Sequence, residues 1–269
     1  MKGIDISEHN GYIDFEKVKK AGIDFVIIRV GWIGNKENHT KDNYFEDYYL
    51  RAKGQGLKIG FYVYSYVRNE SSMNSAIEWI KEQINDKTHE YPIFIDVEDS
   101  QISDLDINIQ TDLCKKFCQA FENSGVYASL DWFKNKLNVN ELLNYKIWLA
   151  QWTTESSHSA NFRVDLWQYT SNGTVDGIYS RVDLNKCLRC DNIEDITGEE
   201  KEVMKIYQNG STIEPVYADT NLTNKIGSLN KYEKCDCYGI FNNRAVVRYK
   251  VDNSNNYKIG FCKWLGGVK

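Results

Sequence analysis

The chain has 269 residues, of which 42% are apolar and 26% charged, and its formal net charge is −5. This composition is typical of a globular protein long enough for one large α/β domain, or for a domain with a small module. It disfavours a nucleic-acid-binding protein, because no net positive field would attract phosphates. No apolar run reaches the roughly 18–20 residues of a membrane span. We therefore expect neither nucleic acid nor membrane among the partners.

Runs typical of strands alternate with helical patterns in the first two thirds of the chain. Apolar runs rich in β-branched and aromatic residues predict strands at 23–32, 58–67, 91–99, 124–130, 146–152 and 164–170. Helical patterns lie between several of them, at 15–22, 47–57, 71–86 and 111–123. Such alternation predicts a parallel sheet, and about eight strands in roughly 190 residues favour a closed barrel. The last strands follow one another closely, so we expect few helices in the second half.

The remaining third divides into a predicted linker and a small module. Residues 192–213 are polar and acidic without a sustained apolar period, which predicts a linker. Residues 214–269 contain short apolar segments separated by Asn, Asp, Gly and Ser, the pattern of an all-β module with hairpins. Residues 205–269 carry a charge of +5 and residues 1–204 a charge of −10. This change of sign predicts two domains with different partners.

The N-terminus and the cysteines bear on the cellular compartment. MKGIDISEHNG lacks the 7–15-residue apolar stretch of a secretory signal. Seven cysteines without such a signal indicate reduced thiols rather than a disulfide framework. The pairs Cys114/Cys118 and Cys187/Cys190 could in principle hold zinc, but small buried thiols are the favoured interpretation. We expect no metal and no cofactor.

Four carboxylates stand at the ends of predicted strands, where the loops of a parallel barrel converge: Asp5, Asp96, Glu98 and Asp183. Asp96 and Glu98 alternate, so the two-residue period of a strand points both to one face. Like charges in a small volume raise the pKa of one carboxyl, which then serves as a general acid while its neighbour stays ionised. Glycoside hydrolysis requires this division of labour. A solvated strand end and a metal site are the alternatives, although the four His residues lack a ligand-type spacing.

Ordered motifs over residues 1–190 resemble the lysozymes of glycoside hydrolase family 25. They are GIDIS, FVIIRVG, GLKIGFYVYSY, IFIDVED, GVYAS, IWLAQW, LWQYTSNGTVDGI and VDLN. The resemblance implies a flattened (β/α)5β3 TIM-like barrel over residues 1–191. It also implies hydrolysis of the β-1,4 bond between N-acetylmuramic acid and N-acetylglucosamine in peptidoglycan.

The resemblance also implies roles for individual residues. Glu98 would be the general acid and Asp96 the second catalytic carboxylate, either orienting the substrate's N-acetyl group as nucleophile or serving an inverting attack by water. Asp5 and Asp183 would complete the acidic cluster. Substrate-binding positions would be Tyr62, Tyr64, Gln151, Trp152, Tyr169 and Arg29. Packing is the alternative for the first two and an ion pair for Arg29, whose segment IIRVGWIG departs from the Lys-Ala-Thr-Glu-Gly of many relatives.

The module at 214–269 resembles the bacterial SH3-like domains that end many endolysins, and its positive charge suits an anionic wall polymer. Met204 follows Glu199-Glu200, a pair whose codons can form a ribosome-binding sequence. An internal start there would release the free module, which could associate with the full-length chain. We expect a phage endolysin that stays in the host cytoplasm until a holin releases it. A host autolysin of the same chemistry and a non-catalytic wall-binding protein are the alternatives.

Overall fold

The computed structural model describes residues 1–189, 205–218, 222–241, 244–250 and 257–263. Met204 and Cys190 lie outside these residues. The chain divides into two compact units, one of residues 1–45 and 57–197 and one of residues 46–56 and 198–269. None of the described helices is both long enough and apolar enough to span a membrane.

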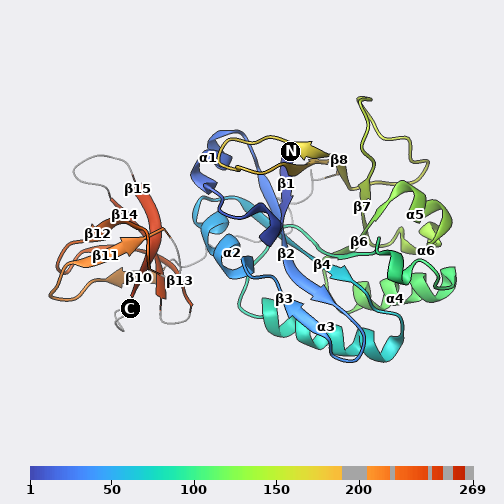
Figure 1. Cartoon of the computed structure of the whole chain (residues 1–269), viewed down its shortest axis with the longest axis horizontal. Coiled ribbons are helices and arrows are strands. Elements are labelled where there is room, and N and C mark those ends of the chain that lie inside the picture. The colour runs from blue at the N-terminus through green and yellow to red at the C-terminus, as the bar shows by residue number, and fades with distance from the viewer. Residues whose placement is uncertain (190–204, 219–221, 242–243, 251–256, 264–269) are drawn as a thin grey trace. The chain divides into compact units, whose positions relative to one another are not determined.

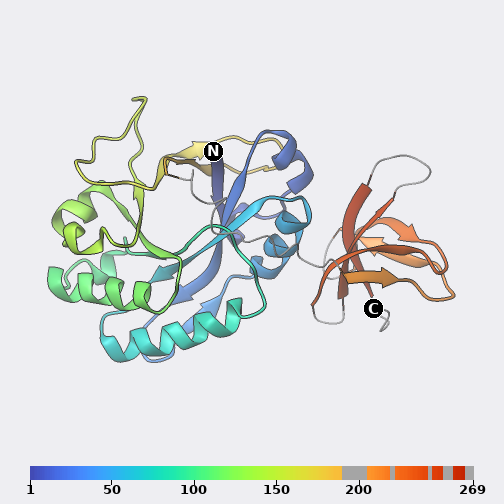
Figure 2. The same ribbon diagram turned by 180° about the vertical axis from the view of Figure 1, so that it is seen from behind.

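The first part of the chain alternates strands and helices as expected (Figures 1 and 2). Its strands are β1 (Lys2–Ile6), β2 (Phe25–Ile33), β3 (His39–Lys41), β4 (Lys58–Ser65), β5 (Ile93–Asp96), β6 (Ser124–Ser129), β7 (Lys146–Ala150), β8 (Leu166–Gly173) and β9 (Val182–Cys187). Its helices are α1 (Phe15–Lys20), α2 (Phe45–Gly54), α3 (Glu70–Ile84), α4 (Ile107–Gln119), α5 (Leu130–Asn135) and α6 (Val139–Leu142), with short 3-10 turns at Glu8–Asn10 and Ser100–Ile102.

Eight of the described strands close into a barrel. The order is β1-β9-β8-β7-β6-β5-β4-β2, and β2 pairs with β1 to complete the circle, while β3 extends the edge of β2. The pairs from β1 through β2 and β4 to β8 are parallel, but β9 is antiparallel to both its neighbours. The loop at 174–181 explains the exception, because a parallel crossover needs about a dozen residues or more.

Helices follow the early strands and then stop. Residues 151–165 and 174–181, all of them described, contain no helix, which confirms the expected helix-poor second half. Helices α3 and α4 lie side by side outside the barrel (Figures 1 and 2). The side chain of Asn69 caps α3 by accepting from Ser72 N. The buried residues of α3 recur at helical spacing, at Met73, Ala76, Ile77 and Ile80.

Aromatic rings fill the amino-terminal end of the barrel interior. Phe25 and Tyr91 stack with their centroids 4.2 Å apart, and Phe94 lies 5.1 Å from Trp148. Gly125 makes room for them, because a Cβ there would lie 2.7 Å from the Phe94 ring and 2.2 Å from a main-chain oxygen. This apolar plug closes one end of the barrel and leaves the polar residues at the other.

The second unit contains an antiparallel sheet of six described strands in the order β10-β13-β14-β15-β11-β12. They are β10 (Lys205–Gln208), β11 (Glu214–Tyr217), β12 (Lys225–Leu229), β13 (Lys234–Phe241), β14 (Arg244–Lys250) and β15 (Tyr257–Lys263). The all-β prediction for this part of the chain agrees with this sheet.

The last part of the predicted linker at 192–213 contains a strand. Residues 205–208 form β10, which pairs with β13. Tyr207 is buried in this unit, and Asn209 donates from Nδ2 to the carbonyl oxygens of Thr212 and Asn230 at 2.7 Å. The strand was missed because it is short and buries few side chains. A buried Asn also reads as a loop residue until its partners are known.

Candidate active site

Four carboxylates gather at the end of the barrel where its parallel strands terminate. Asp5 is the second-last residue of β1 and lies directly opposite Asp183, the second residue of the antiparallel strand β9. Asp96 is the last residue of β5, and Glu98 follows two residues later. Mutual electrostatic effects connect Asp96 with Glu98 and Asp5, and Glu98 with Asp183. The tertiary structure therefore brings together the four acids that the sequence singles out.

Asp5 is buried and held by two side-chain amides. Asn185 Nδ2 donates to Asp5 Oδ2 at 2.7 Å, and Gln168 Nε2 donates to the same oxygen at 3.0 Å. Burial and the charge of Asp183 raise the pKa of Asp5 well above its ordinary value, while the two amide hydrogen bonds act in the opposite direction. Asp5 is thus a buried carboxyl group with two dedicated donors.

Three further donors fix the orientation of these amides. Trp148 Nε1 donates to Asn185 Oδ1 at 2.8 Å. Gln168 Oε1 accepts from Tyr127 Oη at 3.0 Å and from Trp152 Nε1 at 2.9 Å. Because each amide oxygen is already engaged, each NH₂ group must face Asp5. We refer to Gln168, Asn185, Tyr127, Trp148 and Trp152 as the amide network.

Asp96 and Glu98 share an orientation but differ in exposure. The strand ends at Asp96, yet Val97 N still donates to Tyr127 O at 3.1 Å, so the alternation of side chains continues. Asp96 is buried and its Oδ1 has no hydrogen-bond partner among the described atoms, whereas Glu98 is exposed. The pair therefore consists of one shielded carboxyl and one that solvent or a ligand can reach.

All four carboxyls have raised pKa values. Burial is the main cause of the raised pKa of Asp96, followed by the charges of Glu98 and Asp5, and Arg29 opposes them. Partial burial and the charges of Asp183 and Asp99 raise the pKa of Glu98. Burial raises the pKa of Asp183 to about 6. Raised pKa values favour the protonated form of a carboxyl group, which general acid catalysis requires.

Arg29 takes part in an ion-pair network next to this cluster. Its Nε donates to Asp42 Oδ2 at 2.7 Å, and its Nη2 donates to Glu8 Oε1 at 3.0 Å. The Asp42 side chain is fully buried and also accepts from Tyr44 N at 2.9 Å. The guanidinium group is therefore engaged with protein partners, as the ion-pair alternative predicts.

Three of the other predicted substrate-binding residues lie around the acids. The half-buried Tyr62 contacts Trp148 edge-on with centroids 6.0 Å apart, and the charge of Asp5 adds to the burial that raises its pKa. Tyr64 Oη donates to Asp99 Oδ2 at 3.0 Å. Trp152 is 61% exposed, although its Nε1 is anchored on Gln168. It offers a ring face at the mouth of the cluster.

Gln151 and Tyr169 are placed elsewhere. Gln151 exchanges hydrogen bonds with Ser159, whose Oγ accepts at 2.8 Å and whose N–H donates at 2.9 Å. The ring of Tyr169 lies 5.8 Å from Trp167, and Lys186 Nζ stands 5.0 Å above it. Tyr169 follows Gln168, which points to Asp5, so the Tyr169 side chain faces away from the barrel interior. Gln151 follows Ala150, which packs in the interior, so it also faces outward. The structure thus gives no contact of Gln151 or Tyr169 with the four acids.

The sequence reasoning missed the amide network apart from Trp152. Gln168 and Asn185 are 2% and 0% exposed, and Gln168 stands between two aromatic neighbours of its strand. Alternation along LWQYT places Gln168 and Tyr169 on opposite faces, so these two residues could not both face the groove.

The cysteines agree only in part with the prediction. Cys114, Cys118, Cys235, Cys237 and Cys262 are buried and free. Cys187, however, is disulfide-bonded, so the expectation of reduced thiols is wrong at this position. In the described part of the chain no group of three or more His, Cys, Asp or Glu side chains is arranged to hold a metal ion.

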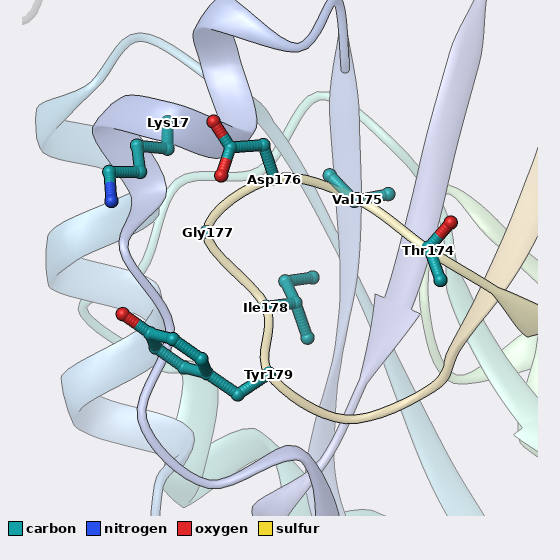
Figure 3. A pocket seen from close by; sticks show the side chains of 7 residues that line it. All are labelled: Lys17, Thr174, Val175, Asp176, Gly177, Ile178 and Tyr179. Carbon is teal, nitrogen blue, oxygen red and sulfur yellow. The ribbon is translucent and has the colours of Figure 1, made fainter.

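A hollow of about 320 Å³ lies between α1 and the loop that connects β8 to β9 (Figure 3). It is lined by Lys17 and residues 174–179, with Tyr179 at its rim 80% exposed. None of the predicted site residues lines it. The acidic cluster, and not this hollow, is the candidate active site.

Comparison with known proteins identifies the family. The family model of the glycosyl hydrolases family 25 matches residues 4–178, which include Asp5, Asp96 and Glu98. The chain belongs to glycosyl hydrolase family 25. The match spans the strands from β1 to β8 and does not reach residues 198–269.

Relatives within family 25 include the autolytic lysozyme of Clostridium acetobutylicum, which is 31% identical over 191 residues. That alignment covers 69% of this chain and 55% of the relative, so this chain spans about half of that protein's length. The modular autolysin LytC from Streptococcus pneumoniae, solved in complex with a synthetic peptidoglycan ligand, is 27% identical with a TM-score of 0.60, covering 68% of this chain and 46% of LytC. A family 25 glycosyl hydrolase from Bacillus anthracis, 19% identical with a TM-score of 0.63, covers 72% of this chain and 92% of that one and shows the fold alone.

Proposed function

We propose that this protein hydrolyses the β-1,4 bond between N-acetylmuramic acid and N-acetylglucosamine in bacterial peptidoglycan. The observation that carries the proposal is the cluster of Asp5, Asp96, Glu98 and Asp183 at the carboxyl end of a family 25 barrel. The name of the clostridial relative and the peptidoglycan ligand of LytC support the choice of substrate.

Exposure and charge assign different tasks to the two central carboxyls. Glu98 is the accessible member of the pair and is placed to donate a proton to the leaving glycosidic oxygen. Burial and the charges of Asp183 and Asp99 raise its pKa, which favours the protonated form that this step needs. Asp96 is buried, and its free Oδ1 would stabilise the positive charge that develops at the sugar, directly or through the substrate's N-acetyl group.

Digestion of purified peptidoglycan with analysis of the new ends tests this proposal. We expect new reducing N-acetylmuramic acid ends, and the configuration of the fresh anomeric carbon distinguishes a retaining from an inverting reaction. Glu98→Gln should lower the rate about 10²–10⁴-fold without loss of wall binding. New amino termini instead of reducing ends, or undiminished lysis by the variant, would contradict the proposal.

For the second unit we propose an SH3-like fold that binds the cell wall, with a domain boundary before β10. Six lysines among its described residues are exposed, five of them in strands and Lys231 in the turn between β12 and β13: Lys225, Lys231, Lys234, Lys250, Lys258 and Lys263. Exposed ammonium groups attract an anionic wall polymer. Tyr207 and Tyr249 are buried, whereas Tyr232 is 62% exposed and offers an aromatic contact.

Binding of full-length Glu98→Gln protein to purified walls tests this second proposal. We expect binding to weaken with added salt and after extraction of the anionic polymer. Binding that is unchanged by both treatments would favour recognition of the peptide crosslinks instead.

We further propose that the protein acts as a phage endolysin that waits in the host cytoplasm for release through a holin. A host autolysin with the same chemistry is the alternative, and the name of the clostridial relative favours it.

Mass spectrometry of the expressed protein tests the proposed internal translation start at Met204. A fragment beginning at Met204 that disappears in Met204→Leu would support it.

A further inference from the structure

A β-bulge in β2 determines which way Trp32 faces. The pairing of β2 with β4 shifts by one residue between Arg29 and Gly31. As a result Arg29 lies opposite Tyr62 and Trp32 lies opposite Tyr64. In an unbroken strand, positions 29 and 32 would point to opposite faces. The bulge turns Trp32 to the inner face, the re-aiming that bulges beside active sites provide.

Trp32 joins two tyrosines there to form an aromatic platform, which we define as Trp32, Tyr64 and Tyr66. Trp32 and Tyr66 meet edge to face, with centroids 5.9 Å apart and ring planes at 88°. Tyr64 and Tyr66 lie 5.1 Å apart. All three side chains are half-buried, so each retains accessible surface. Asp99 accepts a hydrogen bond from Tyr64 at the edge of the platform.

The platform borders the acidic cluster on one side only. Tyr64 is the register partner of Asp96 as well as of Trp32, so Trp32 stands two strands from that acid. Two strand spacings place their Cα atoms about 10 Å apart. Burial is the main cause of the raised pKa of Tyr66, and the charges of Asp99 and Asp96 add to it, so the ring lies near these acids.

We propose that the aromatic platform binds a neutral N-acetylhexosamine ring of the glycan strand, beyond the two sugars at the scissile bond. An aromatic face packs against the apolar face of a pyranose, while the nearby Asp99 accepts from its hydroxyls. The negative charge of Asp99 at the edge of the platform disfavours the anionic lactyl and peptide groups of muramic acid there. This inference rests on the proposed hydrolysis and adds to it a preference for long glycan strands as substrate.

A length series of peptide-free glycan oligomers tests the platform. For the unaltered protein, kcat/KM should rise once the oligomer is long enough to reach Trp32. In Trp32→Ala we expect kcat/KM on the long oligomers to fall about tenfold, mainly because KM rises. The rate on the shortest oligomer that is cleaved should stay the same. Trp32→Phe should retain most of the increase, and Tyr179→Ala removes an exposed ring outside the platform as a matched control.

Calorimetry with an N-acetylglucosamine oligomer gives a readout independent of cleavage. Affinity should fall about tenfold in Trp32→Ala and stay unchanged in Tyr179→Ala. An equal loss of kcat/KM on all lengths, or unchanged affinity for the oligomer, would overturn the platform. If the unaltered protein cleaved no oligomer, the proposed hydrolysis would fail, while calorimetry would still decide whether Trp32 binds the sugar.

Discussion

Gln168→Met removes one of the two amide donors to Asp5 while keeping a side chain of similar length. A hydrogen bond to a charged group contributes about 1.5–3 kcal/mol. Losing it should lower the ratio of ionised to neutral Asp5 about 10- to 100-fold at a given acidic pH. If activity needs the ionised form, the acid limb of the pH–rate profile should therefore shift to higher pH.

The same substitution has a separate cost for stability. Tyr127 is 5% exposed and would lose its acceptor on Gln168, which costs about 1–3 kcal/mol. Trp152 loses the same acceptor, but it is 61% exposed, so water replaces the bond. Urea unfolding at one pH measures this cost apart from the titration.

Trp152→Phe is the matched comparison, since it keeps a ring at the mouth of the site. Tyr127 Oη still donates to Gln168 Oε1 in this variant, so the amide stays oriented toward Asp5 and the acid limb should not move. Rates of wall lysis over the acid range measure both profiles. An unshifted limb in Gln168→Met, or an equal shift in Trp152→Phe, would refute the role of the amide network.

Two further predictions concern charge. Folding raises the pKa of Asp183 from 3.8 to about 6, so its contribution to stability is present at low pH and is lost as pH rises through about 6. The free energy of unfolding of Asp183→Asn should equal that of the unaltered protein below pH 4 and exceed it by about 3 kcal/mol at neutral pH. Urea unfolding at several pH values measures this difference. A difference that does not change with pH would contradict the prediction. Arg29→Met leaves the buried Asp42 without its cation and should destabilise by about 3–5 kcal/mol, measured by urea unfolding. Adding Asp42→Asn should restore part of the loss, and no recovery would argue against the ion pair as the cause.

The pattern of residues determined much of the barrel. Apolar β-branched runs and helical periods are local properties, and they placed most strands and helices within a few residues of their observed bounds. The four acids were also readable, because a charge that ends an apolar strand stands out in the sequence.

Tertiary structure alone decided how these pieces serve the site. The antiparallel direction of β9 sets Asp183 opposite Asp5, and the bulge in β2 turns Trp32 inward. The sequence carries no local signal for either, since register depends on partner strands. The side-chain amides of Gln168 and Asn185 are likewise oriented toward Asp5 by donors on other strands. Composition and periodicity determine which faces are apolar, whereas the pairing of buried polar groups is settled only when the barrel closes.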